Sequence, residues 1–510
     1  MTGVEYVLLF VLLSGAAVFF GDRGDYEYDA LLELSCCRLY YDNDMTCAHR
    51  YYWQPLAYHI NLAVLSISDS PWLMRYLAAM AGAAGCGMLT AAVRGWSGRR
   101  HSIVFTAALL LLLPELVFCL LYYNSTAFGM GFLGLACLLA TGAGRCGLRS
   151  AAAAVACGCA VMSRFEFILI VPLFMYFFMP IRGDRRSLPG FTGVSGLFFI
   201  VMHGLGWLNF RELAAVHYHH RELTALYEQS FGLSHVHYLK VLYVIMHPVA
   251  LGAILAYAVF FAVRAVRRGE LLKLSIFPIV GLALYPVCFL TSGKYLVPLL
   301  CFVPFLLVRM LDEVADLVSA PVFTTVKAGA VCFIAAVQFT SLDPLLMIHE
   351  RTLFISRETG VHTHDGFRSS GAYLASFALV RRGRSEPDNE ASLAVHMVDR
   401  ICDIQRHTVI LLDFERVEPG CRVNPMTLQL RQYLPWLLEM RGYNLLECAG
   451  GLRLERDGHR VEILGVDGSV DTAAIASDGD LLLVDVPSLT AGRDKAMAIR
   501  CVQAALSGQE

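Results

Sequence analysis

The sequence predicts a polytopic α-helical membrane protein with about eleven transmembrane helices, followed by a small soluble α/β domain. Three observations support this fold class. Of the 510 residues, 56% are hydrophobic and only 16% are charged, and the mean hydropathy is +0.55. This is more apolar surface than the core of one soluble protein can bury. After Asp343 the composition changes to mixed charged and apolar residues, so we expect a transmembrane domain over residues 1–345 and a soluble domain over 346–510.

Apolar runs of membrane-spanning length recur through the first part of the chain. A helix needs about 20 residues to cross the hydrocarbon layer, and fewer where neighbouring helices shield it. The first run has no basic residues before it and no small-residue cleavage site after it, so we expect a retained helix rather than a signal peptide. The shorter stretch 56–68 fits a helix lying at the membrane surface. The candidate spans lie near residues 4–20, 73–93, 103–122, 127–141, 150–162, 166–180, 191–209, 239–263, 274–290, 295–311 and 326–345.

The basic residues between these spans orient the chain. Fourteen of them fall on one side, which the positive-inside rule makes cytoplasmic. They are Arg94, Arg99, Arg100, Arg145, Arg149, Arg182, Arg185, Arg186, Arg264, Arg267, Arg268, Lys273, Arg309 and Lys327. The outer side then collects the acidic loop 21–54, the turn 163–166, the His-rich loop 210–240, the turn 291–294 and the soluble domain. We expect an integral protein of a bacterial inner membrane, with the soluble domain in the periplasm and the function on the outer face.

Charge and cysteine content restrict the class of partner. The net charge is -2 and no basic stripe occurs, so nothing indicates binding to nucleic acid. Many of the 16 cysteines lie inside apolar runs, where they act as small buried hydrophobic residues, and no zinc-type CxxC pair occurs. Disulfides among the cysteines of the first loop or of the soluble domain stay open, because spacing does not reveal connectivity.

The soluble domain shows three strand-like segments and one helix. The segments 407–414, 460–466 and 480–486 are rich in β-branched and aliphatic residues, and 428–441 has helical periodicity. Residues 381–390 form a polar loop. A small α/β domain on the outer side follows from this order.

The first outer loop is the most informative segment. Asp22, Asp25, Glu27 and Asp29 follow the first helix directly. A carboxylate that the bilayer partly desolvates has a raised pKa and can act as a general base on a substrate anchored in lipid. A solvated acidic loop is the alternative, and composition alone does not separate the two. The run RYYWQPLAYHIN over residues 50–61 closes the loop with aromatic residues, which typically anchor a helix at headgroup level.

Together, these two segments resemble the first outer loop of GT-C type glycosyltransferases that use lipid-linked sugars. Asp25 followed by Tyr28, and later the Arg-aromatic-x-x-Pro-Leu-x-Tyr run that begins at Arg50, are similar to the family elements D-E-x-x-Y and K-P-P-L-x-Y. The relatives are bacterial aminoarabinose transferases, protein O-mannosyltransferases and the RgtA/B/C/D-like group. Three further segments agree in order and side, and the resemblance spans roughly residues 1–310. They are the polar turn 123–125, Ser-Arg-Phe-Glu at 163–166, which looks like T-R-P-E-G, and 292–298, which looks like G-x-R-Y-L-x-P.

The resemblance implies a sugar that arrives on a polyprenyl phosphate in the membrane and passes to a glycan, lipid or protein acceptor on the outer face. It implies that Asp25 deprotonates the acceptor hydroxyl, with Glu27 beside it. Cations on the outer side can stabilise the leaving phosphate. The candidates for the donor phosphate are Arg164, Lys294, Tyr295 and Arg50, and those for other substrate contacts are Tyr28, Gln54, Glu166 and His219.

Several positions depart from the family pattern. Gln54 stands where the family has a basic residue, and Trp53 stands where it has an acidic one, which changes the phosphate contact and any metal site there. Glu27 is one place later than the second family carboxylate, Phe165 replaces Pro, and Lys294 replaces Arg. The chain looks like a divergent member.

The same residues also have simpler interpretations. Arg164 and Lys294 could be snorkelling residues at helix ends, and Glu166 could form a structural ion pair with Arg164. In the His-rich loop, imidazoles spaced like those at 217, 219 and 220 could hold a divalent metal, although interfacial positions or acceptor contacts explain them equally well. We therefore assign no metal ligand and no cofactor, and leave a divalent metal as an open hypothesis.

Three functions remain in competition. The leading one is a hexosyl- or pentosyltransferase, similar to mannosyltransferases. A transporter or lipid flippase would show paired repeats, mid-membrane Gly or Pro breaks and ionisable residues deep in its helices, and these features are scarce here. A non-catalytic assembly subunit stays open because of the substitutions at Trp53 and Gln54.

Overall fold

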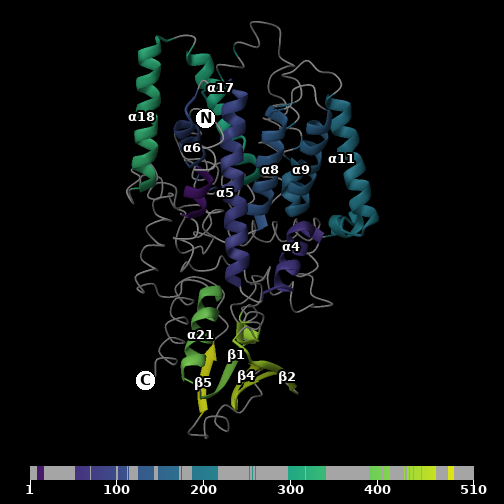
Figure 1. Ribbon diagram of the computed structural model, residues 1–510. Helices are drawn as coiled ribbons and strands as arrows, with labels where there is room; N and C mark the ends of the chain where they lie inside the picture. Colours follow the sequence, from purple (N-terminus) through teal and green to yellow (C-terminus); the bar gives the residue numbers. More distant parts are fainter. Residues whose placement is uncertain are drawn as a thin grey trace.

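The computed structural model describes the chain in separate stretches, together with some single residues between them. The stretches are 9–15, 52–68, 71–98, 101–111, 125–142, 147–169, 187–215, 297–315, 318–339, 390–404, 406–413, 441–448, 451–466 and 481–486. A helical part fills one end of the molecule and a small sheet with one long helix lies at the other end (Figure 1). This agrees with the predicted order of a helical domain followed by an α/β domain.

The helical part is built from apolar helices. Its elements are α4 (Pro55–Leu65), α5 (Pro71–Trp96), α6 (Ile103–Leu111), α8 (Ser125–Gly142), α9 (Gly147–Ser163), η1 (Phe165–Leu169), α11 (Ser187–Gly204), α16 (Val297–Leu300), α17 (Val303–Ala315) and α18 (Ala320–Phe339). Within the described stretches one helical segment, Leu73–Trp96, is long and apolar enough to span a membrane by itself, and five shorter apolar helices accompany it. The helical character is confirmed, whereas the number of spans stays a prediction. The candidate span 274–290 lies outside the described residues, as does nearly all of 239–263.

Glycines allow α5 and α8 to pack closely as parallel neighbours. A Cβ atom on Gly85 would lie 2.7 Å from the carbonyl oxygen of Met130, and one on Gly134 would lie 2.7 Å from that of Gly85. Small residues at such a crossing let the two backbones touch, as is common between membrane helices. The tight contact fixes where α8 begins, and therefore where Ser125 and Thr126 lie.

The predicted span 295–311 is wrong as one continuous helix. It divides into α16 and α17, with a turn at Cys301 and Phe302. Pro304, near the start of α17, has no backbone N–H to continue a helix and favours a helix start at this point. The predicted span 166–180 likewise begins as the 3₁₀ helix η1.

Contacts between helix ends show which ends lie together on the same face of the helical part. A hydrogen bond joins Gln54, directly before α4, to Ser125 at the start of α8, and Arg164 after α9 also bonds to Ser125. These ends lie on the side of the α/β domain, where α4 lies in Figure 1. Arg94 and Arg149 lie at the opposite ends of α5 and α9. The two faces therefore separate as the charge pattern predicts, and which side of a membrane each one meets stays a prediction.

The α/β domain contains a five-stranded sheet. The strands are β1 (His407–Asp413), β2 (Asn444–Cys448), β3 (Gly451–Arg456), β4 (His459–Val466) and β5 (Leu481–Val486), in the order β2-β3-β4-β1-β5. β1 pairs in parallel with β4 and β5, whereas β2, β3 and β4 form an antiparallel meander. The three predicted strands are confirmed as β1, β4 and β5. The described residues within the predicted helix 428–441 are helical up to Glu439.

Three elements of this domain were not predicted: β2, β3 and the helix α21 (Glu390–Ile404). The last residue of the predicted polar loop 381–390 is the first residue of α21. One buried cluster contains Ala57 of α4, Met74 of α5 and Phe128 of α8 together with Met397 of α21 and Ile410 of β1. The α/β domain therefore lies at the end of the helical part where α4 and α8 begin.

Candidate functional site

Three of the predicted site residues lie in the described part of the chain: Gln54, Arg164 and Glu166. The structure brings these three together. The other predicted site residues lie outside the described residues, and their roles stay predictions. They are Asp25, Glu27, Tyr28, Arg50, His219, Lys294 and Tyr295.

Three chain segments meet at this place because four elements begin or end there. Gln54 is the N-cap of α4, whose first residue is Pro55, a favoured start because proline lacks the N–H that a first turn leaves unpaired. Ser125 and Thr126 open α8. α9 ends at Ser163, and Arg164 and Glu166 follow in the turn that becomes η1. The polar side chains are thus presented by helix ends on one face.

Hydrogen bonds connect the segments into one network, which we call the Arg164 network (Gln54, Ser125, Thr126, Arg164 and Glu166). The Nε and Nη2 groups of Arg164 donate to Oε1 of Glu166 at 3.1 and 2.8 Å. Its Nη1 group donates to Oγ1 of Thr126 at 3.1 Å and to Oγ of Ser125 at 3.4 Å. The Ser125 hydroxyl in turn donates to Oε1 of Gln54 at 2.7 Å. Gln54 is therefore held by Arg164 through one hydroxyl.

The network is sealed from solvent. Arg164 and Gln54 are each 2% exposed and Glu166 is 1% exposed. Removing two charges from water costs several kcal/mol per ion, which only good pairing and further hydrogen bonds offset. The predicted ion pair between Arg164 and Glu166 is confirmed, and its burial means that each partner depends on the other.

Two polar groups of the network remain available. Oε2 of Glu166 is buried and accepts no hydrogen bond from any residue that the structure describes. The amide oxygen of Gln54 accepts from Ser125, so its amide nitrogen is the group left to donate. Buried polar groups are normally satisfied, and exceptions require an explanation. The network therefore leaves one buried acceptor, Oε2 of Glu166, without a donor among the residues that the structure describes.

Two departures from the family pattern contact each other. Trp53, in place of an acidic residue, packs edge to face on Phe165, in place of a proline, with ring centroids 5.4 Å apart. Such pairs stabilise a fold by about 0.5–1.5 kcal/mol beyond the area that they bury. The two positions at which the sequence departs from the motifs that it resembles therefore contact each other through an apolar pair beside the Arg164 network.

Arg75 and Thr126 are polar residues that the sequence interpretation missed. Arg75 lies at the start of α5 and is only 2% exposed. Its sequence signal is an arginine in an apolar helix at the end opposite to Arg94, the end that carries the predicted cytoplasmic charges. Thr126 follows Ser125 directly and was the next residue of the polar turn.

No group of three metal-binding side chains occurs among the residues that the structure describes. The His-rich loop lies outside them. The metal hypothesis therefore stays untested.

Comparison with known proteins gives structural neighbours only. No protein-family model matches the chain, and no curated protein does. The chain is similar to the crystal structure of ArnT from Cupriavidus metallidurans in the apo state, with a TM-score of 0.45 and 13% identity over 86% of this chain and 85% of that one. It is also similar to the same protein bound to undecaprenyl phosphate, with a TM-score of 0.45 and 14% identity over 86% and 88%.

Proposed function

We propose that this protein is an integral membrane glycosyltransferase that moves a sugar from a polyprenyl phosphate to an acceptor on the outer face. The Arg164 network is the observation that supports this most. The motif resemblance selects three segments far apart in the sequence, at Gln54, Ser125 and Arg164 to Glu166, and the structure joins them by hydrogen bonds. An accidental resemblance gives no reason for these segments to meet.

Gln54 takes the place of the family's basic residue. Its amide nitrogen can donate a hydrogen bond to a phosphate oxygen, but it brings no positive charge. The charge that stabilises the leaving phosphate then comes from Lys294 and Arg50, with Tyr295 as a further donor. Arg164 is engaged with Glu166, Thr126 and Ser125, so it acts on the phosphate site as a positioning residue, through Ser125 and Gln54.

Glu166 supplies a fixed acceptor. Its Oε1 is held by Arg164, and its Oε2 faces no described donor. A sugar hydroxyl is a ligand of the right chemistry for a carboxylate oxygen inside a closed site. Tyr28 and His219 are the proposed further substrate contacts from the outer loops.

The reaction is an inverting displacement at the anomeric carbon. Asp25 takes the proton of the acceptor hydroxyl, the acceptor oxygen forms a bond to the anomeric carbon, and the bond from that carbon to the phosphate oxygen breaks. The electron pair of the broken bond leaves with the polyprenyl phosphate. Glu27 lies near the base in sequence and would influence its pKa.

The test compares the glycans of a strain that carries the gene with those of a strain that lacks it. We expect glycans that depend on the wild-type gene and disappear with Asp25→Asn, although this variant is inserted in the membrane at the normal level. Asp22→Asn, in the same loop, is the matched control and should restore transfer. Full transfer by Asp25→Asn would remove the proposed base. An unglycosylated acceptor that fails to cross the membrane would instead favour a flippase.

A further inference from the structure

α18 lies at the edge of the helical part, where it packs against α6 (Figure 1). Most of the side chains that the structure describes in α18 are exposed, among them Val322 at 51%, Val326 at 53% and Phe333 at 37%. The hydroxyls of Thr324 and Thr325 each donate to a carbonyl oxygen one turn earlier in the same helix, which satisfies them without water. This surface of α18 is therefore suited to contact with acyl chains.

Lys327 interrupts this apolar surface with a positive charge. It is the eighth residue of α18, so its backbone lies about 10 Å along the axis from the start of the helix. Its ammonium group lies 4.6 Å from the centre of the Phe323 ring, which is one turn nearer that start. The side chain thus runs back toward the start of α18, as a lysine does when it extends from apolar surroundings to the membrane–water interface.

The contacts of Phe323 leave the ammonium group without an oxygen acceptor among the residues that the structure describes. Asp312 of α17 accepts a hydrogen bond from Nε2 of His101 at 3.0 Å. His101 lies edge to face against Phe323, with ring centroids 6.2 Å apart, so the Phe323 ring is held between His101 and Lys327. A ring face attracts a cation, but it does not replace the oxygen acceptors that the three N–H donors of a lysine prefer. A charge within a membrane helix normally has a partner, so this position calls for an anion.

The same contacts show on which face the ammonium group lies. His101 follows the end of α5 by five residues, and Arg94 lies in the last turn of that helix. The start of α18 is therefore on the face of Arg94, opposite to the Arg164 network. The positive-inside rule predicts that this face is cytoplasmic, and the cytoplasmic leaflet carries anionic lipids, whose headgroups bind basic sites between membrane helices.

We propose that α18 binds an anionic phospholipid, with the phosphate on the ammonium group of Lys327 and the acyl chains along the exposed apolar side chains of α18. A phosphate oxygen accepts a charge-assisted hydrogen bond from an ammonium group. A lipid fits this place better than a free anion, because the charge stands beside exposed apolar residues that acyl chains would cover. The inference shares the membrane-embedded helical part with the proposed function, but it concerns the opposite face and no step of the reaction.

The test is native mass spectrometry of the purified full chain in mild detergent, with phosphatidylglycerol and phosphatidylcholine of the same acyl chains as probes. We expect the wild type to retain phosphatidylglycerol in preference to phosphatidylcholine. Lys327→Gln should weaken retention of phosphatidylglycerol about fivefold, the effect of one basic residue near an anionic surface, whereas Lys327→Arg keeps the charge and should retain the lipid.

Two further variants serve as controls. Arg149→Gln removes an exposed cation from the same face, at the start of α9, and Arg460→Gln removes an exposed cation from β4 in the α/β domain. Both should bind phosphatidylglycerol as the wild type does. Thermal unfolding of each variant shows that the helical part is intact.

Each outcome decides the proposal. Loss of phosphatidylglycerol in Lys327→Gln with retention in Lys327→Arg supports the site. Equal binding by Lys327→Gln and the wild type would overturn it, because the lipid would then bind elsewhere. An equal loss in Arg149→Gln would also overturn it, since the preference would then follow the overall positive charge of this face. Retention of a polyprenyl phosphate, which the transferase proposal requires, should be the same in Lys327→Gln and the wild type, so the two proposals can fail separately.

Discussion

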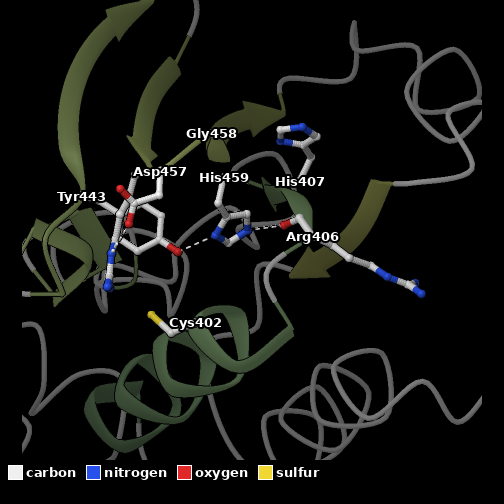
Figure 2. Close-up of a pocket in the computed structure, with 8 residues that line it drawn as sticks. Cys402, Arg406, His407, Tyr443, Asp457, Gly458 and His459 are labelled. Atoms are coloured by element: carbon white, nitrogen blue, oxygen red, sulfur yellow. Dashed lines mark hydrogen bonds and ion pairs between the residues drawn. The ribbon is translucent and has the colours of Figure 1, made fainter.

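Arginine lies next to a carboxylate both in the Arg164 network and in the turn between β3 and β4, and the surroundings give these two pairs opposite properties. In the Arg164 network the two side chains are 2% and 1% exposed. In the turn between β3 and β4 of the α/β domain, which with Tyr443 and His459 we call the open region (Figure 2), the side chains of Arg456 and Asp457 are 47% and 88% exposed. Electrostatic interactions strengthen as water is excluded, so the first pair is rigid and hard to break, whereas the second is weak. A sealed pair suits the fixing of helix ends, and an open pair contributes little to stability.

Glu166→Gln should have the largest effect on stability. It leaves Arg164 buried without a counter-charge, and removing one partner of such a pair typically costs about 3–5 kcal/mol. Asp457→Asn is the counterpart in the open pair and should cost less than about 1 kcal/mol. Unfolding of the purified variants in mild detergent measures both. Losses of equal size would contradict the contrast between the two regions.

Gly85→Ala tests the helix packing that delivers Ser125 and Thr126 to the sealed network. The added methyl group would meet the backbone of Met130 at 2.7 Å, and overpacking of this kind costs about 1–3 kcal/mol. Gly87→Ala, in the same helix, meets nothing within 4 Å and should stabilise the helix by up to about 1 kcal/mol. The same unfolding measurement should give opposite signs for the two variants, and equal signs would refute the close approach of α5 and α8.

Ser125→Ala cuts the link between Gln54 and Arg164. It should cost about 1 kcal/mol of stability and should also weaken binding of a polyprenyl phosphate, because Gln54 loses its orientation. Thr90→Ala removes another buried hydroxyl, which donates to the Cys86 carbonyl of its own helix. It should lower stability by a similar amount and leave lipid binding unchanged. Equal lipid binding by both variants would make the Ser125 link purely structural.

The smallest expected effect is a pH dependence of the stability that His459 contributes in the open region. Burial lowers the pKa of His459 below its usual 6.5. The hydrogen bond to the Arg406 carbonyl acts against this shift, and the nearby His407 and Arg456 act with it. The unfolded chain then binds more protons than the folded one below pH 6.5, so stability falls as the pH drops through that window. Thermal unfolding between pH 7.5 and 5 should show this decline, and it should be shallower in His459→Gln. An identical slope in both proteins would exclude His459 as a source; burial of His396 contributes to the slope that remains.

The open region also contains a tyrosine that keeps its proton at every physiological pH. Burial raises the pKa of Tyr443 to about 12. Its hydroxyl therefore remains a donor to His459, and the acid-side change of this hydrogen-bonded pair comes from the imidazole.

Local patterns predicted much of the fold. The aliphatic runs in β1, β4 and β5 give a clear strand signal, whereas β2 and β3 contain charged residues such as Arg453 and Glu455, which weaken a strand pattern. The break between α16 and α17 lies directly before Pro304 in an apolar run, and hydropathy does not detect it. Patterns of hydrophobicity therefore identify helices and strands better than they identify breaks within a helix.

How well each site could be predicted depends on how far apart its residues lie in the sequence. The pairing of Arg164 with Glu166 is a short-range feature and was predictable from sequence. The contact between Trp53 and Phe165 joins segments more than a hundred residues apart and depends on how α4 and α9 pack. The open region depends on β3, which had no clear sequence signal, so its residues could not be grouped in advance.

The central claim is that the Arg164 network forms one wall of a site for a polyprenyl phosphate. Native mass spectrometry of the purified protein with a polyprenyl phosphate and the corresponding polyprenol tests it most directly. We predict that the wild type retains the phosphate and not the alcohol, that Gln54→Glu loses at least about tenfold in affinity by repulsion, and that Arg460→Gln is unaffected. Equal binding of the phosphate by Gln54→Glu and the wild type, or equal binding of the alcohol, would contradict the claim.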